Sequence, residues 1–321
     1  VERSRGLGDV YKRQEYDDLL NSHLIILWGL NPAESIFGTK TRWYLTQAKE
    51  KGIKIIHVDP RFTESTAAWA DEWIPIRPST DTAMLAAMAY VMITEKLEDR
   101  PYLDKYTVGF DIFKDYILGN KDGIPKTPKW AEKITGVPAA TIENLARMYA
   151  TTKPAALIHG WAPGRTAFGE QFHRMAITLE AMTGNIGVHG GSAGNLMAYP
   201  VRMGSIPAGE DPLNISIKRN KWADCILLGK AGGYPSDIKM MHVVGSNALN
   251  QTENINKSVK ALKKLEFLVV HEQFMTPTAK FADILLPVTT HFERNDIYLP
   301  WLKGYYVIYS NKVIEPMYEC K

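Results

Sequence analysis

A ten-residue phrase that occurs twice constrains the fold of this chain more than any other feature of its sequence. Residues 66–75 read TAAWADEWIP and residues 278–287 read TAKFADILLP, with five identical positions and an aromatic residue at the fourth. The same order of segments precedes both copies: an apolar run ending in Gly-x-Asn, a helical segment, and a second apolar run followed by or ending in an acidic residue. Repetition of a whole series of elements indicates internal duplication. We therefore predict two related α/β units.

The first half shows the alternation of strands and helices that builds a parallel sheet. Residues 24–29 (LIILWG) and 53–58 (IKIIHV) are continuous apolar runs, typical of strands buried on both faces. Between them, Asn31 at an N-cap and Glu34 three residues later predict a helix that continues through Glu50.

A short strand at 72–76 and an amphipathic helix at 80–97 are predicted next. Met84, Met88 and Met92 recur every four positions in that helix, which indicates a stripe of core residues rather than a metal site. The pattern then predicts short helices on either side of 136–138, a buried strand at 155–160, a helix at 170–182 and a glycine-rich loop at 183–195.

The second half repeats this outline. A buried strand is predicted at 239–247, a helix capped by Asn250 with Glu253 at its third position, and a strand at 267–272. The fold class is thus α/β, with two pseudo-symmetric, Rossmann-like, doubly wound parallel-sheet units. We expect the first unit at 15–193 and the second, partial, at 194–321. Residues 1–14 resemble translated adapter sequence and are expected to be non-native, and truncation is expected at both ends.

Composition narrows the class of protein. Apolar residues make up 45% and charged residues 23%, values of an ordinary globular chain, and the net charge of +3 has no concentrated basic stripe that would indicate nucleic-acid binding. No apolar run reaches the roughly 18 residues of a membrane span, so direct membrane insertion is not expected. The two cysteines, Cys225 and Cys320, are far apart, which excludes an iron–sulfur or structural zinc site within this stretch.

Each repeated unit has the features of a nucleotide-binding corner. A buried strand that ends in Gly and leads into a helix directs free N–H groups to the carboxyl edge of the sheet, where phosphates bind; these corners contain Gly29 with Asn31, and Gly245 with Asn247. An acid after the next strand, Asp59 or Glu272, is placed to accept from ribose hydroxyls. The alternative is an ordinary strand–helix corner with a solvated acid, and the repetition favours binding.

The segment IRPSTD (76–81) indicates which base a bound nucleotide would have. Thr80 or Asp81 could simply cap the helix that begins there. A carboxylate can also accept two hydrogen bonds from the N–H edge of guanine, which adenine does not offer. Asp81 therefore favours a guanine nucleotide. No GxGxxG follows either strand, which disfavours a generic NAD or FAD enzyme.

From about residue 20 to the end, the chain resembles molybdopterin oxidoreductases of the dimethyl sulfoxide reductase family, and within it the catalytic subunits of anaerobic dimethyl sulfoxide reductases. The segments that show the resemblance are WGLNPAES, HVDPR, IRPSTD, GWAPGR, TGNIGVHGG and HEQFMTPTAKFADILLP. The resemblance implies a bis-molybdopterin guanine dinucleotide (Mo) cofactor, with each α/β unit holding one guanine dinucleotide tail.

The resemblance also implies roles for individual residues. Asn31 would lie at a pyrophosphate, Asp59 at a ribose or guanine, and Asp81 at the guanine edge, while Glu272 and Thr276 would contact the other nucleotide. The remaining positions matched by family segments are Gly29, Arg61, Thr80, Gly160, Trp161, Gly245 and Asn247. The GWAPGR turn and the TGN loop are expected beside the pterins. Ser79 stands where the family usually has Gly.

The resemblance further implies a parent enzyme that reduces small oxidants, sulfoxides or N-oxides, in anaerobic respiration. Its partners would be an iron–sulfur electron-transfer subunit and a membrane anchor subunit, and its [4Fe-4S] cluster would lie in a domain preceding this stretch. No catalytic residue or metal ligand is identified here, so the chain alone is expected to be inactive. Relatives are often exported by the twin-arginine route and attached to the cytoplasmic membrane through partner subunits. The sequence does not determine the compartment of this protein.

Two alternatives remain from the sequence. The chain could be a non-catalytic scaffold related to the large subunit of NADH:quinone oxidoreductase, although Asp59, Asp81, Glu272 and Thr276 together favour a cofactor-binding protein. The second alternative is that His159, His173 and His291 act as proton relays; we interpret them as hydrogen-bonded structural residues instead.

Overall fold

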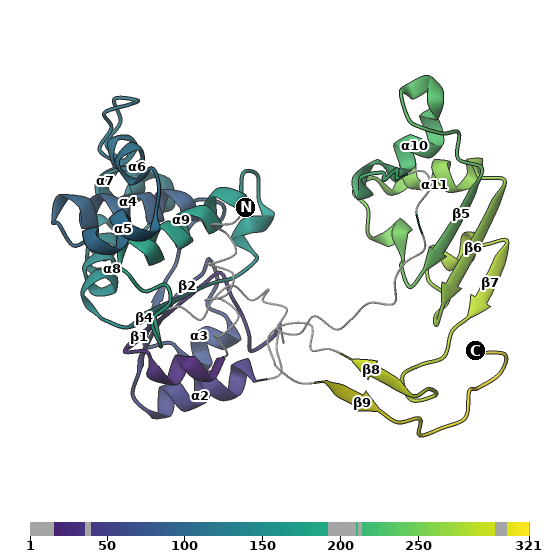
Figure 1. Ribbon diagram of the computed structural model, residues 1–321, viewed down its shortest axis with the longest axis horizontal. Helices are drawn as coiled ribbons and strands as arrows, with labels where there is room; N and C mark the ends of the chain where they lie inside the picture. Colours follow the sequence, from purple (N-terminus) through teal and green to yellow (C-terminus); the bar gives the residue numbers. More distant parts are fainter. Residues whose placement is uncertain (1–15, 36–39, 192–209, 211–213, 299–306, 321) are drawn as a thin grey trace. The chain divides into compact units, whose positions relative to one another are not determined.

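The computed structural model of the chain describes residues 16–35, 40–191, 210, 214–298 and 307–320, and all statements below concern these residues. Those up to 191 belong to one compact unit and those from 210 onward to a second (Figure 1). The segment 1–14 and the expected boundary at 193–194 lie outside the described residues. Within them, no helix combines the length and apolar character that crossing a bilayer requires.

The first unit is built on a parallel sheet with strand order β3-β2-β1-β4. Its strands are β1 (Leu24–Trp28), β2 (Lys54–Val58), β3 (Glu72–Ile74) and β4 (Ala155–His159). The registers run from Leu24 to Trp28 beside both β2 and β4, so these three strands end level with one another at one edge of the sheet. The continuous apolar runs predicted these strands correctly, because both faces of β1 and β4 are buried.

Helices cover both faces of this sheet, as a doubly wound fold requires. One face packs against α4, α7, α8 and α9, with α5 and α6 at the periphery, and the other against the 3-10 helix η1 together with α2 and α3 (Figure 1). The bounds are η1 Tyr16–Asn21, α2 Thr41–Glu50, α3 Glu64–Trp69, α4 Asp81–Thr94, α5 Arg100–Tyr106, α6 Phe110–Ile117, α7 Pro128–Thr135, α8 Ala139–Thr151, η2 Pro163–Arg165 and α9 Glu170–Met182.

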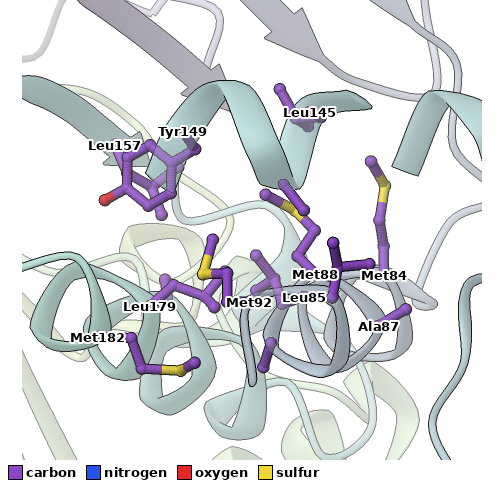
Figure 2. Close-up of a cluster of buried hydrophobic side chains, with 14 of the residues drawn as sticks. Met84, Leu85, Ala87, Met88, Met92, Leu145, Tyr149, Leu157, Leu179 and Met182 are labelled. Atoms are coloured by element: carbon purple, nitrogen blue, oxygen red, sulfur yellow. The ribbon is translucent and has the colours of Figure 1, made fainter. Parts of the chain in front are cut away.

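The helix α4 is the centre of the larger core. Met84, Met88 and Met92 are all buried there and pack with side chains of α8 and α9, among them Tyr149 and Leu179 (Figure 2). The interpretation of the methionines as core residues is thus confirmed. The helix is not amphipathic as predicted, because neighbouring helices surround it and ten of its fourteen residues are buried.

Two predicted helix starts are wrong. The first helix, α2, begins at Thr41 and not after Asn31, and Asn31 lies instead in a turn in which its carbonyl accepts from the N–H groups of Glu34 and Ser35. In the second unit α11 (Ile255–Lys264) is capped by Asn254, whose side chain accepts from the N–H of Lys257, and not by Asn250 with Glu253.

The second unit contains a three-stranded parallel sheet of order β5-β6-β7. The strands are β5 (Met240–Val244), β6 (Phe267–Glu272) and β7 (Ile284–Pro287); the helices are α10 (Trp222–Leu228) and α11, with 3-10 turns η3 Arg219–Lys221, η4 Lys230–Gly232, η5 Ala248–Asn250 and η6 Ala279–Phe281. An antiparallel hairpin, β8 (Asp296–Tyr298) with β9 (Ile308–Ser310), was not predicted.

The prediction that β5 is buried is wrong. The side chains of Met240 and Val244 are 52% and 66% exposed, whereas Val243 between them is buried. The helices α10 and α11 pack on one face of the sheet only (Figure 1). An apolar run shows that a strand can be buried on both faces, but burial also needs an element that covers the second face.

Candidate functional site

The carboxyl end of β1 and the carboxyl end of β5 have the same backbone geometry. Gly29 follows β1 with φ +59° and donates its N–H to the carbonyl of Val58 at 2.9 Å. Gly245 follows β5 with φ +57° and donates to the carbonyl of His271 at 3.2 Å. Both glycines adopt the left-handed conformation that other residues disfavour. The Gly-x-Asn corner predicted from sequence is therefore formed in both units.

In the first unit, the asparagine of this corner is bound to the first turn of α3. Asn31 Oδ1 accepts from the Ser65 N–H at 3.2 Å and from its hydroxyl at 2.6 Å. The Ser65 hydroxyl in turn accepts from the Ala33 N–H at 2.9 Å. These bonds explain why Asn31 does not cap a helix, since its oxygen is already occupied.

The second unit repeats these hydrogen bonds. Asn247 Oδ1 accepts from the Thr278 N–H at 3.3 Å and from its hydroxyl at 2.7 Å, and that hydroxyl accepts from the Leu249 N–H at 3.0 Å. We call this arrangement the Asn–hydroxyl clamp, formed by Asn31 with Ser65 and by Asn247 with Thr278. Two units that share it atom for atom support the internal duplication more strongly than the repeated phrase alone.

The clamp also corrects the alignment of the two phrases. By identity, Thr66 would pair with Thr278, but the hydrogen bonds pair Ser65 with Thr278. The aspartates of the phrase are equivalent as aligned, because Asp71 Oδ2 accepts from the Ile55 N–H at 2.8 Å and Asp283 Oδ2 from the Leu268 N–H at 2.7 Å. The second unit is therefore one residue shorter between clamp and aspartate, where η6 replaces α3.

A cavity of about 750 Å³ lies at the carboxyl edge of the first sheet. Six of the predicted first-unit residues line it: Gly29, Asn31, Asp59, Arg61, Asp81 and Trp161. Also in its wall are Glu34, Thr63, Ser79, Pro163, Arg165 and Thr166. The volume is in the range of sites for sizeable small molecules and cofactors. Asp59 and Asp81, predicted to contact ribose and guanine, thus border one cavity.

Asp81 is held at this cavity by the indole of Trp28. The Trp28 Nε1–H donates to Asp81 Oδ1 at 2.8 Å, and only 6% of the aspartate is exposed. Burial raises the pKa of the Asp81 carboxyl, the Trp28 hydrogen bond opposes the rise, and the charge of Asp59 adds to it. Thr80 occupies the N-cap position of α4 but makes no capping bond, because its hydroxyl donates to the Arg77 carbonyl at 2.6 Å.

Asp59 directs one carboxylate oxygen back to its own turn. Its Oδ1 accepts from the Arg61 N–H at 2.9 Å, while its Oδ2 lies 3.8 Å from Nε2 of the buried His57. Burial lowers the pKa of His57, against the opposing charge of Asp59. The Arg61 side chain is 73% exposed and 3.9 Å from Glu34, so it is free to reorient toward an anion in the cavity.

Gly160 and Thr80 are predicted site residues that do not line the cavity. Gly160 ends β4 and donates to the Trp28 carbonyl at 2.7 Å, and a Cβ at this position would lie 2.0 Å from the Gly29 carbonyl oxygen. Its role is thus the close approach of two strand ends. A Cβ on Gly29 would in turn lie 2.5 Å from the ring of Pro163, which shows how tightly the GWAPGR turn packs on the end of β1.

In the second unit the predicted acid, Glu272, is the last residue of β6, and the predicted threonine, Thr276, follows it. Glu272 Oε1 accepts from the Gln273 N–H at 2.8 Å, and Thr276 Oγ1 accepts from the Ala279 N–H at 3.2 Å. The first unit repeats the threonine contact: Thr63 Oγ1 accepts from the Thr66 N–H at 3.3 Å. Thr63 lines the first cavity and was missed, because alignment of the two phrases by identity pairs Thr276 with Glu64, and only the hydrogen bonds pair it with Thr63.

The described part of the TGN loop lies away from this cavity. Asn185 Oδ1 accepts from the Ala155 N–H at 3.2 Å, at the amino end of β4, and Gly190 packs against the residues that precede β1. These contacts are at the opposite edge of the sheet from the strand-end acids. Residues 192–195 of the predicted loop lie outside the described residues.

The buried His159 and the half-buried His173 lie with their Nδ1 atoms 2.9 Å apart, and His159 Nε2 lies 3.8 Å from the buried Glu180. Burial lowers the pKa of His173, and a Cβ at Gly164 would lie 2.3 Å from its Nε2. His173 therefore packs directly against the GWAPGR turn at Gly164, which agrees with the interpretation of both histidines as structural residues.

Comparison with known proteins adds the observation that decides the family. The chain matches the molybdopterin oxidoreductase family over residues 8–321. It belongs to that family. This molybdopterin oxidoreductase chain is 40% identical to dimethyl sulfoxide reductase DmsA of Haemophilus influenzae and 42% identical to that of Escherichia coli K12, each over 95% of its length. It is also 32% identical to a dimethyl sulfoxide/trimethylamine N-oxide reductase of Rhodobacter capsulatus over 98% of its length.

The molybdopterin oxidoreductase chain spans about two-fifths of these relatives, 42%, 41% and 42% of their lengths. Among solved structures, acetylene hydratase from Pelobacter acetylenicus matches 97% of this chain and 49% of its own, with a TM-score of 0.67 and 22% sequence identity. That likeness supports the α/β fold. Similarity to reductases at these identities does not favour the scaffold alternative.

Membership of this family implies a molybdopterin cofactor, and the residues of the first cavity fit such a group. Arg61 and Arg165 are cations suited to phosphate oxygens, and the left-handed Gly29 leaves the end of β1 free of a side chain. Asp59 and Asp81 supply acceptors for hydroxyl and N–H donors on the same wall. A phosphorylated, hydrogen-bonding cofactor matches this donor set.

Proposed function

We propose that this chain is the central cofactor-binding part of a molybdenum oxidoreductase and holds the guanine dinucleotide tails of bis-molybdopterin guanine dinucleotide. The observation that supports this most is the duplicated corner: each unit has a left-handed Gly, an Asn–hydroxyl clamp and an acid after the second strand. Two equivalent corners suit a cofactor that has two equivalent nucleotide tails.

In the first unit, Asn31, Arg61 and Arg165 would hold a pyrophosphate, Asp59 a ribose and Asp81 the N–H edge of guanine. In the second, Gly245 and Asn247 would hold the phosphates, and Glu272 with Thr276 the nucleoside. The molybdenum centre supplies oxygen-atom transfer when bound, and the protein positions and tunes it. By itself, this stretch offers binding and orientation.

The parent enzyme would reduce sulfoxides or N-oxides in anaerobic respiration; similarity to dimethyl sulfoxide and trimethylamine N-oxide reductases supports this class of substrate. Its [4Fe-4S] cluster would lie in a preceding domain, and its electrons would come from an iron–sulfur subunit linked to a membrane anchor subunit. The chain of residues 15–321, without those parts, is expected to reduce neither substrate with a dye donor.

The test of the proposed base contact is the variant Asp81→Asn, assayed by calorimetry with GDP and ADP. An amide cannot accept from both N–H groups of guanine, so GDP should bind about ten-fold more weakly while ADP binding changes little. Asp59→Asn is the matched control, because ribose is common to both nucleotides and both should weaken alike. Equal loss of GDP and ADP with Asp81→Asn would show that Asp81 does not read the base.

A further inference from the structure

A buried histidine beside the first cavity has a ring nitrogen without a hydrogen-bond partner. His57 lies on β2 and is 0% exposed. Its Nε2 makes no hydrogen bond among the described residues and lies 3.8 Å from Oδ2 of Asp59, which lines the cavity. The Leu30 carbonyl also faces the ring without completing a hydrogen bond. A fully buried polar atom without a partner is rare in folded proteins and needs a physical explanation.

The other ring nitrogen determines where the proton of His57 lies. Its Nδ1 is 2.5 Å from the hydroxyl oxygen of Thr66, and that oxygen accepts from the Thr63 N–H at 3.2 Å. The Thr66 hydroxyl proton is directed to Nδ1, which is closer than Thr63 Oγ1 at 3.2 Å. Because Nδ1 then accepts, the ring proton lies on Nε2. The opposite tautomer would turn a lone pair of Nε2 toward the Asp59 carboxylate, which would repel it.

The protonation state of His57 agrees with this tautomer. Burial lowers the pKa of the ring, and the charge of Asp59 and the Leu30 carbonyl oppose the change. The ring is therefore neutral at neutral pH, with one proton to donate. That proton is on the nitrogen that faces Asp59.

The second unit lacks this arrangement. In the register set by the hydrogen bonds of the two units, Val270 stands at the position of His57 and Ala279 at that of Thr66, and both are buried. The acid that follows, Glu272, accepts from the Gln273 N–H and has no histidine behind it. The fold thus forms the same corner with apolar residues at these positions. The buried polar pair in the first unit is a feature of that corner alone.

We propose that His57 is a positioning residue for nucleotide binding, and that its Nε2–H holds the Asp59 carboxylate in the orientation that receives a ribose. This inference rests on the proposed function of Asp59. Oδ1 of Asp59 accepts from the Arg61 N–H at 2.9 Å, so the two donors act on opposite oxygens of one carboxylate. A carboxylate has about four acceptor sites, so lone pairs remain for the hydroxyls of a ribose. Because the ring is fully buried, it acts through Asp59 and does not touch the ligand.

Calorimetry with GDP and ADP tests this role in two variants of the 321-residue chain. His57→Leu removes the Nε2–H and should weaken both nucleotides alike, by about five-fold, since ribose is common to them. His57→Gln has an amide that can donate to Asp59 and accept from Thr66, so its affinities should stay within about two-fold of the wild type. Ile55→Ala, at a fully buried residue of the same strand, is the control for lost packing and should leave both affinities unchanged.

Two further measurements separate positioning from packing. In a double-mutant cycle on GDP affinity, His57→Leu should cause no further loss once Asp59 is replaced in Asp59→Asn. The nitrogen chemical shifts of the imidazole, identified by their disappearance in His57→Gln, should show the proton on Nε2.

Four results would overturn the role of His57. These are wild-type affinity in His57→Leu when Asp59→Asn weakens both nucleotides, a loss in His57→Gln as large as in His57→Leu, an equal loss in Ile55→Ala, and a ring proton on Nδ1. Failure of the proposed function would give a different result. The wild-type chain would then bind neither nucleotide, or Asp59→Asn would bind both as the wild type does, and the role of His57 would be refuted with it.

Discussion

The carboxylate of Asp81 is 6% exposed and accepts one hydrogen bond from Trp28, and its pKa is raised chiefly by burial. A carboxyl whose pKa is higher in the folded state than in the unfolded state binds its proton more tightly when folded. Ionised Asp81 therefore destabilises the first unit at pH values above the raised pKa. This penalty is absent below the ordinary carboxyl pKa, where both states are protonated.

Asp81→Asn should consequently stabilise the chain at neutral pH by about 1 kcal/mol while weakening guanine binding. The amide oxygen can still accept from Trp28. The gain in the free energy of unfolding, measured by denaturant titration, should be full above the raised pKa of Asp81 and should shrink as the pH falls through it toward the ordinary carboxyl pKa of about 3.9. A loss of stability at neutral pH would mean that the fold stabilises the ionised form and that the carboxylate is structural.

The glycines of the two corners differ in one respect that substitution can isolate. Gly29 and Gly245 have almost the same positive φ, but a Cβ on Gly29 would lie 2.5 Å from the Pro163 ring and one on Gly245 would meet nothing within 4 Å. Gly245→Ala should cost the second unit about 1–2 kcal/mol from backbone strain alone. Gly29→Ala should cost the first unit a further 1–3 kcal/mol, roughly, from overpacking.

Hydrogen exchange of the β1 and β5 amides reports each unit separately. Equal losses in the two variants would contradict the packing of the GWAPGR turn on the end of β1.

At the scale of elements, the Asn–hydroxyl clamp links the turn after one strand to the segment after the next. In the first unit it links the turn after β1 to α3, and in the second unit it links the turn after β5 to the segment after β6. Asn31→Ala or Ser65→Ala should each lower stability by about 1–3 kcal/mol, because the partner group is left without its hydrogen bond. Asn247→Ala and Thr278→Ala should act likewise in the second unit. In a double-mutant cycle, each clamp pair should show a coupling energy of about 0.5–3 kcal/mol.

The mixed pair, Asn31→Ala with Thr278→Ala, shares no hydrogen bond and is the control, with an expected coupling near zero. Unfolding is followed through the β1 and β5 amides. Coupling within only one of the two clamps would refute the equivalence of the units.

The sequence predicted those elements whose burial is decided locally. Continuous apolar runs located β1, β4 and β6 with their ends, and helical periodicity located α9 at Glu170–Met182. It failed where a distant contact decides the outcome: Asn31 has the properties of an N-cap, but Ser65, thirty-four residues away, takes its oxygen. It failed also at β5, where Met240 and Val244 are exposed although the apolar run predicted burial on both faces.

The candidate site shows the same division. Gly29, Asn31, Asp59, Arg61, Asp81 and Trp161 were predicted to contact the cofactor, and all line one cavity, because the carboxyl ends of parallel strands meet at one edge. Thr63 was missed, since a single threonine has no distinctive pattern, and Arg165 was included only as part of the GWAPGR segment. Gly160 was assigned to the site, but its close contact with Gly29 depends on the register of β1 and β4.

At the scale of the whole molecule, the chain has two units, each with one proposed nucleotide-binding corner. Duplication of the left-handed Gly, the clamp and the acid implies that the two corners bind the same kind of ligand. The family supplies a molybdopterin cofactor, and two guanine dinucleotide tails would use both corners at once. The proposal therefore fixes both the number of guanine nucleotides bound per chain, two, and the preference for guanine over adenine.

Equilibrium dialysis of the chain with GDP tests this claim most directly. We expect two equivalents of GDP bound per chain, one weakened about ten-fold in Asp81→Asn and the other weakened in Glu272→Gln, with ADP displacing GDP less readily than GDP itself does. A single equivalent of bound GDP, or two that ADP displaces as readily as GDP does, would contradict it.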